Sequence, residues 1–101
     1  MKYDVSNVFI TGGKKLTTTN LTQLFSSQPA EPPRKGIRLK GDPGNSGTIY
    51  VGNSNITSNT DSDNVGYPLS ANEEVELYLE DLTLLHAMAS SANDVISWVV
   101  E

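Results

Sequence analysis

Alternation of apolar and polar residues marks several segments of the chain as strands with one buried face. The clearest segment is residues 73–79, where Val75, Leu77 and Leu79 alternate with polar or amphipathic side chains. This period of two is typical of a half-buried β-strand. The same period recurs at residues 37–40, 49–51 and 95–100. The side chains predicted to form one core are Ile37, Leu39, Ile49, Val51, Val75, Leu77, Leu79, Ile96 and Trp98.

The N-terminal third of the chain has a less regular pattern. β-Branched and aromatic residues predict a strand over residues 2–10, ended by Thr11-Gly12-Gly13 as a turn. A second short strand is predicted over residues 16–19, and one helical turn over residues 20–25. The proline-rich segment 26–33 then predicts an extended connector without ladder hydrogen bonds.

Turn residues separate the remaining strands at short intervals. Residues 42–45 (Asp-Pro-Gly-Asn) and 52–55 (Gly-Asn-Ser-Asn) are strong turns on either side of the strand at 49–51. Residues 82–89 are compatible with a buried strand or with a two-turn helix, and their place between two good strands favours a strand. The fold class predicted is all-β: an antiparallel β-sandwich or a small jelly-roll-like barrel with an N-terminal arm. Residues 1–35 form the arm or added strands, and residues 36–101 form the sandwich domain.

Composition limits how this fold is stabilised. With 101 residues the chain forms one domain with a thin core, and it has no cysteine for disulfides or thiolate metal sites. No apolar run approaches the roughly 18 residues of a membrane span, so we expect a soluble protein with no membrane contact. Oligomerisation is a natural source of additional buried area.

Charge divides the chain into two parts. The first forty residues hold all seven basic residues and two of the twelve acids, a net +5, and the other ten acids give the remainder −10. The two sets of charges can pair inside one sheet, or they can meet between copies or on a partner.

No motif supports catalysis or a cofactor. His86 is the only histidine, and a half-buried strand position is its simplest interpretation. Residues 61–64 (Asp-Ser-Asp-Asn) are similar to the opening of a calcium loop, but Val65 replaces the third ligand and Asn72 the terminal acid. We therefore expect no enzyme activity, no catalytic, cofactor or metal residues and, at a pI near 4.7, no nucleic-acid binding.

The segments NSGTIYVGNSNITS and GYPLSANEEVELYLEDL, with a final aromatic strand, resemble small β-sandwich virion proteins of tailed bacteriophages. The resemblance covers roughly residues 36–100. The matching positions are Asn45, Gly47, Ile49, Tyr50, Val51, Gly52, Pro68, Leu69, Glu74, Val75 and Trp98.

The resemblance implies a virion structural protein, assembled in the host cytoplasm. We expect a capsid decoration or cement protein that binds the major capsid protein or other virion proteins as a homo-oligomer, with a trimer as one form. A head-tail connector or tail component is the alternative, and so is a receptor- or glycan-binding module that uses Tyr50, Tyr67 and Tyr78. The predicted interface residues are Arg34, Lys35, Arg38, Lys40, Tyr50, Glu74, Glu76, Tyr78 and Glu80.

Overall fold

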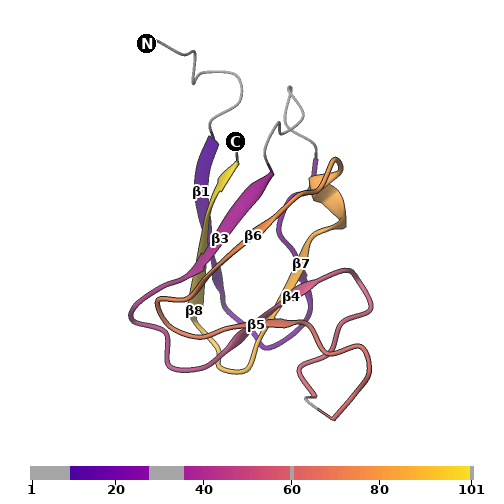
Figure 1. Ribbon diagram of the computed structural model, residues 1–101. Coiled ribbons are helices and arrows are strands. Elements are labelled where there is room, and N and C mark those ends of the chain that lie inside the picture. The colour runs from indigo at the N-terminus through magenta and orange to yellow at the C-terminus, as the bar shows by residue number, and fades with distance from the viewer. Residues whose placement is uncertain (1–9, 28–35, 60, 101) are drawn as a thin grey trace.

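In a computed structural model, the chain folds into two antiparallel four-stranded sheets (Figure 1). The structure describes residues 10–27, 36–59 and 61–100. The first sheet, called the β8 sheet below, has the order β1-β8-β3-β6. Its strands are β1 (Ile10–Leu16), β8 (Asp94–Val100), β3 (Ile37–Gly41) and β6 (Glu74–Leu77). The second, called the β7 sheet, has the order β2-β7-β4-β5. Its strands are β2 (Thr22–Gln23), β7 (His86–Ala89), β4 (Ile49–Gly52) and β5 (Tyr67–Leu69).

The all-β sandwich expected from the sequence is confirmed. The two N-terminal strands are edge strands of the same two sheets: β1 pairs with β8, and β2 pairs with β7. Residues 2–9 of the strand predicted over residues 2–10 lie outside the described residues, and so does most of the proline-rich connector.

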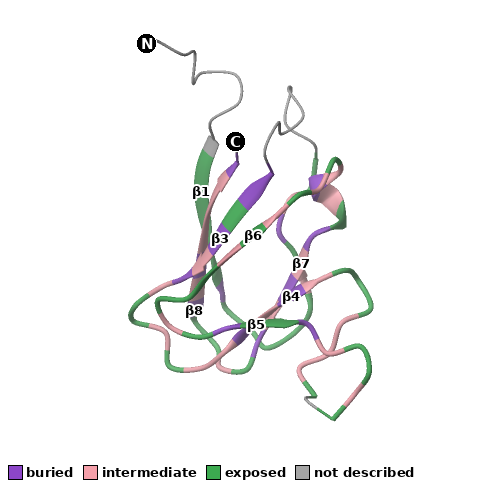
Figure 2. Cartoon of the chain, viewed as in Figure 1, coloured by how far each residue is buried: buried purple, intermediate pink, exposed green. Residues whose placement is uncertain are grey.

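The core lies between the sheets, and buried residues occur on strands of both of them (Figure 2). Five of the predicted core residues are no more than 2% exposed: Ile37, Leu39, Ile49, Val51 and Ile96. The other four, Val75, Leu77, Leu79 and Trp98, are partly buried and pack against that cluster. Eight further buried hydrophobic residues lie outside that set of nine: Leu16, Leu24, Leu69, Leu82, Leu85, Ala87, Ala89 and Val100.

Strand β1 continues through the glycine pair, so the turn predicted at residues 11–13 is wrong. Gly12 lies opposite Trp98 in the ladder, and a Cβ atom at Gly12 would lie 2.8 Å from the indole Nε1. The missing side chain therefore makes room for the indole. The second strand predicted over residues 16–19 is also wrong, because β1 ends at Leu16.

Two other local predictions are corrected by tertiary pairing. The helical turn predicted at residues 20–25 is replaced by β2, because one helical turn gains few hydrogen bonds and β2 instead pairs with β7. In the stretch 82–89, predicted as one strand, the 3-10 helix η1 (Leu82–Leu84) precedes β7. The Asp81 carboxylate caps η1 and accepts a 3.0 Å hydrogen bond from the Thr83 N–H.

The connection between β3 and β4 is fixed to the start of β8 by two side chains. The Asn45 side chain donates to the Val95 carbonyl oxygen at 2.9 Å and accepts from the Val95 N–H at 2.7 Å. The buried Asp94 carboxylate accepts from the backbone N–H groups of Ser46 at 3.0 Å and Gly47 at 2.9 Å. We call the hydrogen bonds of Asn45 and Asp94 the clamp. The clamp links the β7 sheet, through β4, to β8, one of the two central strands of the β8 sheet.

Candidate docking surface

The outer face of the β8 sheet brings together residues from all four of its strands. Strand register aligns them in two rows that run across the sheet from β1 to β6. One row is Thr11, Val99, Arg38 and Glu76, and the other is Gly13, Ser97, Lys40 and Glu74. We call these eight residues the docking face. Its half on β1 and β8 carries small uncharged side chains, and its half on β3 and β6 carries four charges.

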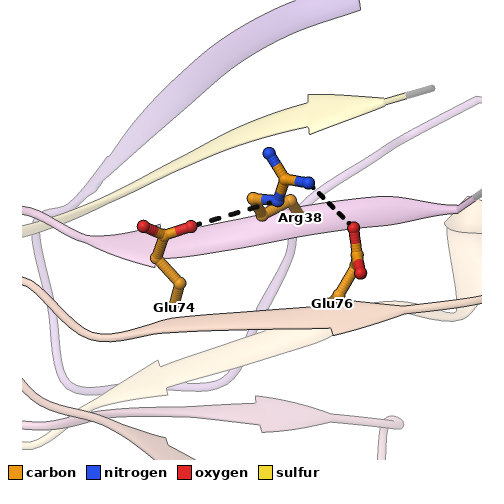
Figure 3. Close-up of polar contacts among 3 residues, drawn as sticks. All are labelled: Arg38, Glu74 and Glu76. Carbon is orange, nitrogen blue, oxygen red and sulfur yellow. Dashed lines mark hydrogen bonds and ion pairs between the residues drawn. The ribbon is translucent and has the colours of Figure 1, made fainter.

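Arg38 is the centre of the charged half (Figure 3). Its Nη2 atom donates to the Glu76 carboxylate at 2.9 Å, and its Nε atom lies 4.0 Å from a carboxylate oxygen of Glu74. The three side chains remain 46%, 52% and 61% exposed for Arg38, Glu74 and Glu76. Ion pairs this exposed contribute only about 0–1 kcal/mol each, so the arrangement organises the face more than it stabilises the fold.

These ion pairs bear on the two interpretations of the divided charge. For Arg38, the basic and acidic parts of the chain do pair inside one sheet. Lys40 lies opposite Glu74 in the same ladder. The charged half of the docking face is therefore balanced within one chain, and a partner would meet an alternating pattern of charge rather than a uniformly basic patch.

The other predicted interface residues do not all join this face. Tyr50 lies on β4 in the other sheet, and Tyr78 and Glu80 follow the end of β6, which is shorter than the predicted strand 73–79. Arg34 and Lys35 lie outside the described residues. The structure thus brings together Arg38, Lys40, Glu74 and Glu76 from the predicted set.

The three tyrosines considered for glycan binding do not form one surface. Tyr67 is the cross-strand partner of the inward-facing Val51, so Tyr50 points to the opposite side of the β7 sheet. Tyr78 lies in the segment that follows β6 of the β8 sheet. Tyr67 is 54% exposed on β5 of the β7 sheet, and Tyr78 is 60% exposed just after a strand of the β8 sheet.

The described residues contain no group of three or more His, Asp or Glu side chains placed to hold a metal ion. His86 is half-buried on β7, and its Nδ1 lies 3.1 Å from the Leu84 carbonyl oxygen. No helix in this part of the chain is long and apolar enough to cross a membrane.

Sequence analysis missed the uncharged half of the docking face and the lysines of β1. Val99 and Ser97 lie between the charges of β3 and the edge strand β1. The alternation in residues 95–100 already placed them on the face opposite Ile96 and Trp98. Lys14 and Lys15 belong to β1, which the sequence did not predict as a strand.

Comparisons of the chain with protein-family models, with curated proteins and with solved structures find no match.

Proposed function

We propose that the chain is a structural protein of a tailed-bacteriophage virion, a decoration or cement protein that binds the assembled head as an oligomer. The observation that carries the docking part of this proposal is the docking face: an open, four-stranded sheet surface with small side chains on one half and paired charges on the other. The virion part comes from the sequence resemblance over residues 36–100.

Several of the residues that carry the resemblance stabilise this fold. Asn45 and Gly47 belong to the clamp on β8, Ile49 and Leu69 are fully buried, and Trp98 packs against the core. The resemblance therefore lies in positions that set the sandwich, which supports a shared architecture with the small virion proteins.

A cement protein needs a surface that binds a repeated position on the capsid, and it needs no catalytic site. The docking face suits this role because its side chains come from strands of one sheet and share one outward direction. Each exposed ion pair is weak, so several polar contacts at one lattice position must act together to keep that position occupied.

The copy number of the chain in purified virions of the phage that encodes it tests this proposal. Quantitative mass spectrometry against the major capsid protein should give on the order of hundreds of copies, as a lattice of symmetric head positions requires. About six or twelve copies would instead indicate a connector, which forms a single ring. Absence from purified virions would overturn the structural role.

A further inference from the structure

The two edges of the β8 sheet carry opposite charge. At one edge, β1 exposes Lys14 and Lys15, and at the other edge β6 exposes Glu74 and Glu76. Within the described residues, Ile10 to Lys15 take part in no backbone hydrogen bond outside the β1–β8 ladder, and Glu74 to Leu77 in none outside the β3–β6 ladder. Each edge therefore presents unpaired backbone groups to another strand.

Burial shows that the β6 edge leaves the core incompletely covered. The inward residues Val75 and Leu77 of β6 are only partly buried, whereas Ile37 and Leu39 on the neighbouring β3 are 0% exposed. One further strand beside β6 would cover Val75 and Leu77.

We propose that the β1 edge of one copy pairs with the β6 edge of a second copy, so that the β8 sheet continues across the two chains. This inference rests on the oligomeric part of the proposed function and names its contact. Neighbouring strands of the sheet alternate in direction from β1 to β6. A second copy rotated about an axis along the strands therefore places β1 antiparallel to β6, and repetition of this contact closes a ring when the rotation allows it.

Charge selects this pairing over the two symmetric ones. Joining β1 to β1 would bring four lysines into one short ladder, and joining β6 to β6 would bring four glutamates together. Like charges on directly opposed strands are destabilising, and unlike charges are stabilising. On the outer face, Lys15 of one copy would lie beside Glu74 or Glu76 of the next, whose side chains are more than half exposed and can accept from a second cation.

Disulfide trapping tests the contact, because the natural chain has no cysteine. Full-length Lys15→Cys chains are mixed, under mild oxidation, with ¹⁵N-labelled Glu74→Cys or Glu76→Cys chains, and mass spectrometry separates mixed from identical dimers. We expect the mixed dimer as the main product of at least one pair, because the proposed ladder places the two positions side by side on the outer face. A mixture of Lys15→Cys with Asp61→Cys, an exposed loop position, is the matched control and should give only a background yield.

Three results would overturn the proposal: dominant dimers of Lys15→Cys alone, dominant dimers of the glutamate variants alone, or mixed dimers no more abundant than in the Asp61→Cys control. Thermal melting of each variant establishes that it is folded. This experiment uses only the purified chain, whereas the proposed function is tested by the copy number in virions. The edge contact can therefore be disproved while the proposed function stands.

Discussion

At the scale of single residues, Asp94 is one of the two side chains that fix the β3–β4 connection to β8. It is the only buried charged residue within the described ranges, at 3% exposure, and its carboxylate accepts from Ser46 and Gly47. Because this carboxylate is buried and charged, its hydrogen bonds are of the stronger kind, and losing them costs free energy. The clamp therefore links a loop conformation to the stability of the whole sandwich.

Replacing Asp94 with alanine should lower the free energy of unfolding by about 1–3 kcal/mol, since the hydrogen bonds that the Ser46 and Gly47 N–H groups donate to a charged carboxylate are lost. Urea denaturation followed by circular dichroism measures the change. Asp61→Ala, an exposed acid of the loop before β5, is the matched control and should stay within about 0.5 kcal/mol of the natural chain. Equal stability of the two variants would show that the clamp does not matter.

At the scale of elements, β1 depends on the contact between Gly12 and the indole of Trp98. The indole also packs against Phe25, with ring centroids 4.9 Å apart. A side chain at Gly12 would displace the indole from this position. The edge strand and the aromatic pair are thus one packing unit.

We expect Gly12→Ala to shift the fluorescence of the single tryptophan to longer wavelength and to destabilise the fold by about 1–3 kcal/mol, the usual effect of overpacking. Gly13→Ala is the control, because Gly13 lies on the other face of β1 and its three nearest neighbours do not include the indole. Identical emission from both variants and the natural chain would contradict this account of β1.

Alternation was sufficient to predict the central strands. It placed Ile37, Leu39, Ile49 and Val51 inward because a period of two leaves no other way to bury them. It failed at β1, where a glycine pair that usually marks a turn instead makes space for Trp98. Local propensity contains no information about such a partner 86 positions later in the chain.

The candidate site was predictable only in part, for a related reason. The sequence placed Arg38 and Lys40 on one outward face and Glu74 and Glu76 on another. Arg38 pairs with Glu76 because β3 lies beside β6 in a particular register. The predicted strands alone specify neither the order of the strands in the sheet nor their register.

At the scale of the whole molecule, the chain is a small sandwich, and we propose that its docking face binds a larger assembly. Because each exposed ion pair is weak, the binding must come from several residues of the face acting together. Reversing Arg38 and Lys40 to glutamate removes both cations from the docking face and leaves the core residues unchanged. The milder Arg38→Gln/Lys40→Gln variant removes the charge without placing new acids opposite Glu74 and Glu76.

The most direct measurement is the rebinding of purified chain to virions assembled without it. The natural chain should bind at regular head positions visible by electron cryomicroscopy, and both double variants should bind at least about tenfold more weakly, a change of ~1.4 kcal/mol. Asp61→Lys/Asp63→Lys, which changes the net charge of an exposed loop by the same amount in the opposite direction, should bind as the natural chain does. Failure of the natural chain to bind heads, or full binding by the folded Arg38/Lys40 variants, would contradict the account.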